Sequence, residues 1–143
     1  MSTNFAIAFC NTYIHVKLDP DFVISTESMN KLWLRLAEAS SLYNCQHIFA
    51  EGLMPSRRMD MAGAFVSGDK LAQSIAGLYM ACFFEGYETD ELTEFFKTVA
   101  RNRGAMVEFF NTREEAFRWL GINLPQENHP GEPNNNHVTY FLM

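Results

Sequence analysis

Two adjacent arginines have the clearest potential for chemistry in this sequence. Arg57 and Arg58 stand in a loop just before a segment with helical spacing. A helix N-terminus exposes unpaired N–H groups, and two guanidinium groups beside it would complete a site for an anion. Surface arginines that pair with nearby acids would give the same pattern. Both interpretations stay open at this point.

A run of carboxylates follows about thirty residues later. It comprises Glu85, Glu88, Asp90, Glu91 and Glu94. The helix dipole favours negative charge at a helix start, so a solvated first turn accounts for the run. The functional alternative is a recognition surface for a basic partner. Acid–base catalysis would need one of these carboxyls to be buried with a raised pKa, and all five are expected to be exposed.

The histidines and serines point away from catalysis. No HxxxH or HxH spacing relates the four histidines, which are His15, His47, His129 and His137. No nucleophile elbow is present, and the segment Ser67–Lys70 lacks the glycine pattern of a phosphate loop. Ser67 is expected to be an ordinary helix residue. We therefore predict no catalytic residue, no metal site and no cofactor.

The three cysteines indicate a reduced environment. Cys10, Cys45 and Cys82 form no CxxC pair, and their number is odd. Each lies in an apolar run, where a free cysteine behaves as a small buried hydrophobe. Since secreted domains tend to pair their cysteines, a cytoplasmic location is expected.

Length and composition predict one globular domain. The chain has 143 residues, of which 48% are hydrophobic and 20% charged, and this balance excludes disorder. The net charge of −6 argues against nucleic acid or an anionic membrane as partner. The first residues carry no basic signal-peptide region, and no apolar run approaches the roughly 18 residues of a membrane span.

The elements that would position these residues alternate between strand and helix. Strands are expected at Phe5–Cys10, Tyr13–Leu18, His47–Ala50, Leu78–Phe84 and Ala105–Phe110. Helices are expected after caps at Ser25 or Thr26, Asp60, Thr89 and Thr112. This order predicts an α/β fold with a single mixed, mostly parallel sheet of about five strands. An N-terminal antiparallel hairpin and about four helices complete it.

Aromatic residues are expected to form the core between these elements. The stripe includes Phe95, Phe96, Phe109, Phe110 and Phe117, and the helix after Asp60 is expected to turn Met61, Ala64, Phe65, Leu71 and Ala72 inward. Abundant Phe and Met can also line a pocket, because such side chains adapt to varied partners. A ligand pocket between the sheet and the aromatic helices therefore stays open as an alternative.

The composition changes near residue 124. Residues 1–124 are expected to form the α/β domain, and residues 125–143 a polar linker with an apolar tail. Val138–Met143 alternates as a strand does, and it is expected to add to a sheet edge, its own or that of a neighbour. The tail would then permit a homo-oligomer. The alternative is a disordered end.

The segment Met106–Leu120, MVEFFNTREEAFRWL, carries a resemblance to a known family. It resembles the closing strand and acidic helix of bacterial SpoIIAA-like proteins of the STAS superfamily. The order of hairpin, helix and alternating strands over residues 5–121 is similar too. The resemblance implies a regulatory, protein-binding α/β domain, and its likeness to lipid-binding CRAL-TRIO domains keeps an apolar ligand in view.

The resemblance also bears on a phosphorylation switch. In phosphorylated relatives a turn Asp-Ser-Ser-Gly carries the serine. Here Asp60 and Gly63 match that turn, whereas Met61 and Ala62 replace both serines. We therefore expect no such switch at this place.

We expect a non-enzymatic regulatory or protein-interaction module of STAS/SpoIIAA-like type. The alternative is a carrier or sensor of a small apolar or acyl ligand; an enzyme ranks third. An apolar pocket of about 300 Å³ or more would favour the carrier, and convergent perturbed titratable residues an enzyme.

In a parallel sheet, the loops after the strands gather at one edge, where ligands tend to bind. The partner- or anion-binding residues predicted there are Arg57, Arg58, Asp60, Gly63, Glu85, Tyr87 and Glu88.

Overall fold

The computed structural model describes residues 4–53, 61–88, 90–123 and 138–142. For residue 61 and residues 138–142 it describes the backbone alone. Arg57, Arg58 and Asp60 therefore lie outside the described residues.

The chain folds as an α/β domain, as the alternation of elements predicts. The strands are β1 (Phe5–Cys10), β2 (Ile14–Leu18), β3 (His47–Leu53), β4 (Tyr79–Glu85), β5 (Met106–Phe110) and β6 (Val138–Leu142). The helices are α1 (Thr26–Tyr43), α2 (Met61–Ser74), α3 (Glu91–Asn102) and α4 (Arg113–Leu120). The predicted fold class, a mixed and mostly parallel sheet with an N-terminal hairpin and four helices, is confirmed.

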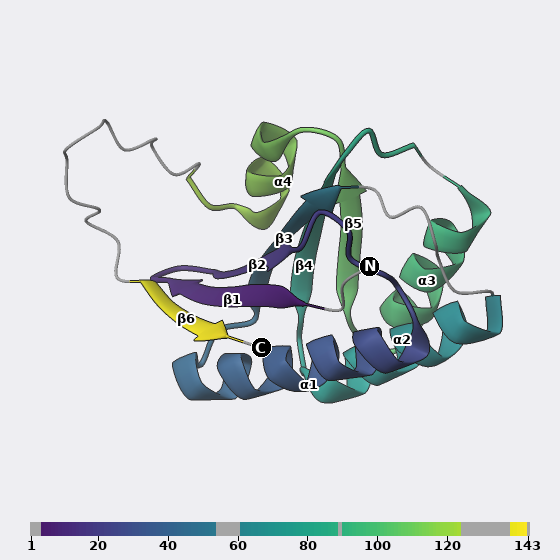
Figure 1. Cartoon of the computed structure of the whole chain (residues 1–143), viewed down its shortest axis with the longest axis horizontal. Coiled ribbons are helices and arrows are strands. Elements are labelled where there is room, and N and C mark those ends of the chain that lie inside the picture. The colour runs from purple at the N-terminus through teal and green to yellow at the C-terminus, as the bar shows by residue number, and fades with distance from the viewer. Residues whose placement is uncertain (1–3, 54–60, 89, 124–137, 143) are drawn as a thin grey trace.

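One sheet holds the strands in the order β5-β4-β3-β2-β1-β6 (Figure 1). The four strands from β2 to β5 run parallel, and β1 is antiparallel to β2. The last strand, β6, pairs antiparallel with β1 from Cys10↔Val138 to Ala6↔Leu142. The prediction that the tail adds to a sheet edge is thus confirmed, and the edge is the chain's own.

The two faces of the sheet are covered by different helices. Helices α1, α2 and α3 lie on one face, and α4 lies on the other (Figure 1). Because side chains alternate along a strand, each face has its own core. The face under α1–α3 buries Ile7, Val16, Ile48, Met80 and Val107, among others. The face under α4 buries Tyr13, Phe49, Ala81, Ala116, Phe117 and Leu120.

Local sequence sets the helix ends. Ser25 caps α1 through a reciprocal pair of hydrogen bonds with Ser28. Thr112 caps α4 by accepting the Glu115 N–H, and Gly121 ends it with φ of 72°. Both N-caps agree with the sequence prediction. The left-handed conformation at residue 121 suits glycine, which has no Cβ to clash.

Two predictions of detail are wrong. The N-cap of α3 is Asp90, whose side chain accepts the Thr93 N–H, and not Thr89. Phe65 was expected to face inward, but it is 41% exposed. The inner face of α2 instead presents Ala64, Ser67 and Leu71, spaced three and four residues apart, and this places Phe65 at the side of the helix.

Within the described residues, no helix is both long and apolar enough to cross a bilayer. The three cysteines are free thiols. Cys45 and Cys82 are buried, as expected, and Cys10 is half-buried.

Candidate functional site

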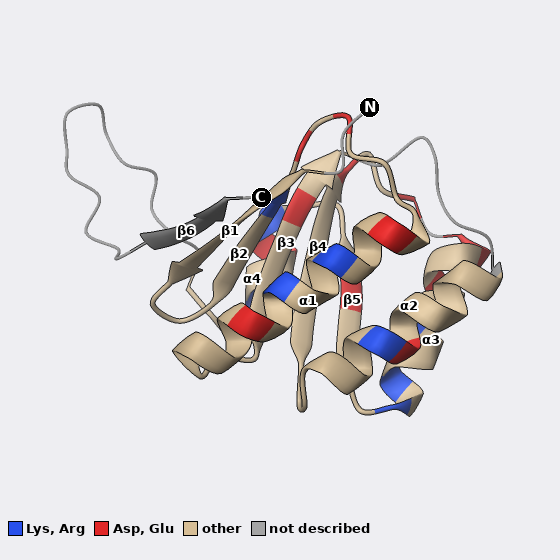
Figure 2. Cartoon of the chain, turned by 60° about the horizontal axis from the view of Figure 1, so that its bottom comes forward, with Lys and Arg blue, Asp and Glu red and all other residues tan. Residues whose placement is uncertain are grey.

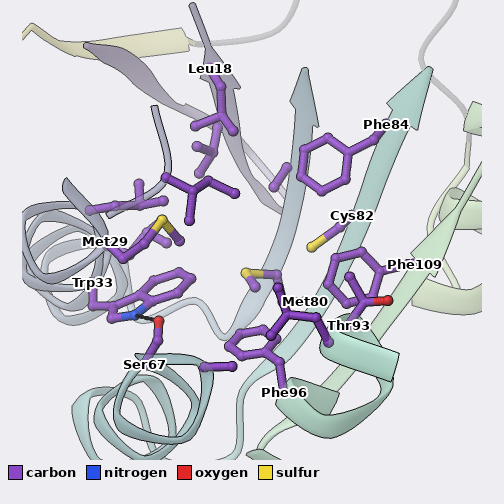
Figure 3. A pocket seen from close by; sticks show the side chains of 17 residues that line it. Leu18, Met29, Trp33, Ser67, Met80, Cys82, Phe84, Thr93, Phe96 and Phe109 are labelled. Carbon is purple, nitrogen blue, oxygen red and sulfur yellow. Dashed lines mark hydrogen bonds between the residues drawn. The ribbon is translucent and has the colours of Figure 1, made fainter. Parts of the chain in front are cut away.

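A cavity of about 100 Å³ lies between the sheet and helices α1–α3 (Figure 3). Its wall is almost entirely hydrocarbon, aromatic ring and sulfur. The described side chains that line it are Val16, Leu18, Ile24, Met29, Leu32, Trp33, Leu36, Ala50, Ala64, Ser67, Met80, Cys82, Phe84, Leu92, Thr93, Phe96 and Phe109.

Strand alternation supplies the floor of the cavity. Met80, Cys82 and Phe84 occupy every second position of β4 and so share the face under the helices. Ala50 on β3 stands opposite Cys82 in the register. A small side chain in the middle of the floor leaves room that larger neighbours would otherwise fill.

Helix packing shapes the walls. A Cβ added to Gly68 of α2 would lie 3.1 Å from the Phe96 carbonyl oxygen and 3.2 Å from the Val99 side chain of α3. Glycine at this position therefore lets α2 and α3 approach closely. Gly68 lowers the helix propensity of α2, and the close approach is the packing reason for its presence. On the other side, Trp33 of α1 stacks with Phe96 at a centroid distance of 6.2 Å.

The polar groups of the lining are bonded to one another or to the chain. Trp33 Nε1 donates to Ser67 Oγ at 2.8 Å, which joins α1 to α2. The Thr93 hydroxyl donates to the Asp90 backbone and carboxylate oxygens at 3.1 and 3.0 Å. Burial raises the pKa of the Cys82 thiol, and the nearby Glu108 carboxylate raises it further. A ligand inside would thus meet apolar surface and a protonated thiol.

The cavity opens between the first turns of α1 and α3. Most lining residues are buried, and the half-buried ones are Ile24, Met29, Leu92, Thr93, Phe96 and Phe109. The first four of these flank the edge at which β2 and β4 end, with Leu18 and Phe84 as the last lining residues of those strands. The opening therefore lies at the carboxyl edge of the parallel strands, where ligands of α/β folds commonly bind.

Three of the predicted site residues lie beside this opening. Glu85 and Glu88 are exposed, and Tyr87 is half-buried. The Tyr87 ring stacks on Phe109, which lines the cavity, at 5.5 Å. Gly63 lies in the first turn of α2. The remaining three, Arg57, Arg58 and Asp60, fall outside the described residues.

A second group of polar residues lies on the opposite face of the sheet, and no pattern in the sequence indicated it. His15 of β2 is hydrogen-bonded through Nε2 to Glu51 Oε2 of β3. Arg113, the first residue of α4, donates from Nη1 to both Glu51 oxygens at 3.1 and 3.2 Å. The Arg113 guanidinium also lies 5.3 Å from the centre of the Phe49 ring.

Glu51 is the centre of this group. Burial alone would raise the pKa of Glu51, but the hydrogen bonds and charges of His15 and Arg113 outweigh it and hold the pKa below 4.5. Burial and the adjacent Cys10 raise the pKa of Tyr13, which lies next to the group. The contacts of Glu51 span β2, β3 and α4, so they fasten α4 to the sheet.

Sequence reasoning held open a pocket between the sheet and the aromatic helices, and Phe96 and Phe109 of the aromatic stripe do line the cavity. It did not identify the residues of the floor. The alternation of Met80, Cys82 and Phe84 along β4 was the sequence feature from which the floor of the cavity could have been predicted. The histidines were considered for metal binding, and His15 instead pairs with a carboxylate 36 residues away. Among the described residues, no group of three or more His, Cys, Asp or Glu side chains is arranged to hold a metal ion.

Comparisons with known proteins identify no relative of the chain: no family model, no curated protein and no solved structure matches it. The geometry of the chain's own residues is therefore the basis on which a function can be proposed.

Proposed function

We propose that the chain is a non-enzymatic carrier or sensor of a small apolar or acyl ligand. The ligand would occupy the cavity between the sheet and α1–α3. The supporting observation is a hollow lined by apolar side chains whose polar groups already have partners. Sequence reasoning ranked this function second to a protein-interaction module. The cavity is smaller than the about 300 Å³ that sequence reasoning set for a carrier, and its purely apolar lining is the reason for placing this function first, for a correspondingly smaller ligand.

The size of the cavity limits the ligand. The volume of about 100 Å³ is below the roughly 300 Å³ at which drug-sized pockets begin. An apolar cavity of about 150 Å³ takes up benzene, so this smaller one suits a hydrocarbon group of about four carbon atoms. Each buried methylene contributes about 0.8 kcal/mol, which predicts dissociation constants of about a few millimolar for such short chains. Rapid, reversible binding suits a sensor or carrier.

The chemistry of the lining favours binding over catalysis. Among the described lining residues, Cys82 is the only ionisable one, and its raised pKa keeps it a thiol. A thiol is a poor nucleophile compared with a thiolate. The Ser67 oxygen accepts a hydrogen bond from the Trp33 indole, which provides no base to activate the hydroxyl.

A cavity-filling variant tests the proposal. Ala64 is buried in the wall on α2, so Ala64→Leu should occupy the space of the ligand. In a Trp119→Phe background, where Trp33 is the remaining indole, butanol should change the fluorescence of the parent and leave the Ala64→Leu variant unchanged. Val66→Leu is the control, because Val66 is 40% exposed on the same helix. Equal binding of butanol to all three proteins would refute the proposal.

A second candidate function is a protein-interaction module of STAS/SpoIIAA-like type without the phosphorylatable serines. Its supporting observation is the exposure of Phe65 and Val66, 41% and 40%, two and three residues after Gly63. In the family that the chain resembles, partners bind at this turn. The order of strands and helices is consistent with such a module. Phosphopeptide mapping is expected to find no stoichiometric modification between Met59 and Gly63, and a modified Ser56 nearby would restore the switch in displaced form.

A further inference from the structure

The two outer strands of the five that precede α4 are protected in different ways. On one side of the sheet, β5 carries Glu108, which is paired with Lys97 of α3. On the other side, β1 has no charged residue and no proline, and Figure 2 shows no charged position along it. Charges and prolines keep an exposed strand edge from pairing with other chains. The edge of β1 therefore needs another strand to cover it.

In the described fold, β6 is the strand that covers β1. Its backbone pairs antiparallel with β1 in a continuous register that begins at Cys10↔Val138. Among the described elements, β6 packs substantially against β1 alone. Ile7 and Ala8, in the middle of β1, are buried. The contacts that hold β6 are thus contained in the β1–β6 pair, and the β6 of a second copy of the chain would make the same contacts.

The chain that leads to β6 is long enough to reach a second molecule. Fourteen residues, 124–137, separate the end of the α4 region from Val138. Fully extended, a chain of that length spans about 50 Å. A folded protein of this size has a radius of gyration of about 15 Å. The connection therefore allows β6 to reach the β1 edge of a neighbouring copy as well as its own.

We propose that two copies of the chain form a dimer by reciprocal exchange of β6, in which each β1 edge accepts the β6 of the other copy. The register of the β1–β6 pair is kept, and the exchange closes with twofold symmetry. The pairing is the same in the monomer and the dimer, so protein concentration decides between them. A tethered strand has an effective concentration of millimolar order, and the dimer should become abundant as the protein approaches it.

A disulfide across the β1–β6 pair tests the exchange. Val138→Cys puts a cysteine at the register position opposite Cys10, and opposed residues of an antiparallel pair lie within the Cα separation that a disulfide spans. Unlabelled and nitrogen-15-labelled Val138→Cys proteins are mixed, unfolded in urea with a reductant, and refolded together at about 10 µM and at about 1 mM. After removal of the reductant, diamide oxidises the two thiols to a disulfide and takes up their two hydrogen atoms as the hydrazine.

Peptide mass spectrometry then shows which chain supplied each half of the disulfide. At the lower concentration both halves should carry the same label, because the strand pairs within its own chain. At the higher concentration, disulfides with one labelled and one unlabelled half should increase at least about fivefold. Sedimentation of the unsubstituted chain over the same concentrations is an independent measurement, and a dimer should appear toward the higher one.

Thr139→Cys is the matched control. Its register partner is Phe9, so it has no cysteine opposite it on β1. Refolded and oxidised in the same way, it should give no more mixed-label disulfide than the unsubstituted chain, in which Cys10 is the half-buried thiol.

Disulfides whose halves carry the same label at both concentrations would overturn the proposal. An equal yield of mixed-label disulfide from Thr139→Cys would do so too. If Val138→Cys forms no disulfide with Cys10 within or between chains, β6 does not pair with β1 in solution and the exchange fails with it. None of these outcomes bears on the cavity, whose function is tested separately by butanol.

Discussion

The two faces of the sheet differ in what holds their helices. Three helices cover one face, and a cavity of about 100 Å³ remains beneath them. One eight-residue helix covers part of the other, with the rings of Phe49 and Phe117 only 4.5 Å apart and Glu51 tied to α4. More cover does not mean tighter packing. The helices α1–α3 pack around an apolar space, whereas α4 is held by several aromatic contacts of Phe117 and Trp119 with the sheet and by one charged group.

The largest expected effect breaks the aromatic contact under α4. Phe49 is fully buried and touches Phe117 and Arg113, so Phe49→Ala should lower the free energy of unfolding by about 3–5 kcal/mol. Met29→Ala, in the half-buried wall of the cavity, should cost less than about 2 kcal/mol because one side of that residue already faces empty space. Urea unfolding of both variants measures the difference. Equal losses would mean that the two faces are packed alike.

The next effect removes the charge that fastens α4. Glu51→Gln should cost about 1.5–3 kcal/mol, the range for hydrogen bonds to charged groups. Glu38→Gln is the control, since its pair with Arg35 is exposed and should contribute less than about 1 kcal/mol. Thermal and urea unfolding at pH 7 would decide between them, and a Glu51→Gln effect no larger than the control would show that α4 is held by packing alone.

The stabilisation by the Glu51 contacts depends on pH. Because the folded-state pKa of Glu51 lies below its ordinary value of 4.5, the unfolded chain binds a proton first as the pH falls. The stabilisation is therefore complete well above pH 4.5 and is lost as the pH falls from there through the folded-state pKa. The stability gap between the parent and Glu51→Gln should close over that range. A gap that persists below it would contradict the assignment.

A smaller effect concerns the cavity face. Butanol at ten times its dissociation constant should stabilise the parent by about 1.4 kcal/mol, since it binds the folded state alone. The Ala64→Leu variant should show no such gain in melting temperature. A gain of equal size in both proteins would place the alcohol elsewhere on the molecule.

The smallest expected effect on stability is at Arg57 and Arg58. Reversal of both to Glu should change the free energy of unfolding by no more than about 0.5 kcal/mol, as at ordinary surface sites. Binding of an anion or of an acidic partner should weaken. Matched losses of binding and of melting temperature would instead make these arginines structural.

The order of elements could be predicted because it depends on local patterns. The alternation in Tyr13–Leu18 and the caps at Ser25 and Thr112 each depend on residues only a few positions apart in the sequence. The wrong predictions of the helix cap and of the inward face arise where two neighbouring residues could each take the same position. Thr89 and Asp90 can both cap a helix, and the structure uses the aspartate. Phe65 fits an apolar face by spacing, but the close approach at Gly68 fixes which side of α2 meets α3.

The sites were harder to predict because they form between distant parts of the chain. The cavity exists where the small side chains of Ala50 and Ala64 lie beside larger side chains from other elements. The spacing of apolar residues along one element does not indicate how much volume is left between elements. The Glu51 contacts join residues 36 and 62 positions apart, so they depend on strand register and on where α4 crosses the sheet.

The glycine at position 68 also has a consequence for motion. Since it brings the backbones of α2 and α3 together, these two helices form one stiff body, whereas α1 is joined to α2 across the cavity by the Trp33–Ser67 hydrogen bond. We expect α1 to separate from the α2–α3 pair more readily than these two separate from each other. The rate at which a ligand exchanges would then depend on the Trp33–Ser67 hydrogen bond and on the Trp33–Phe96 ring contact, and amide exchange in the first turns of α1 should respond to ligand before that in α3.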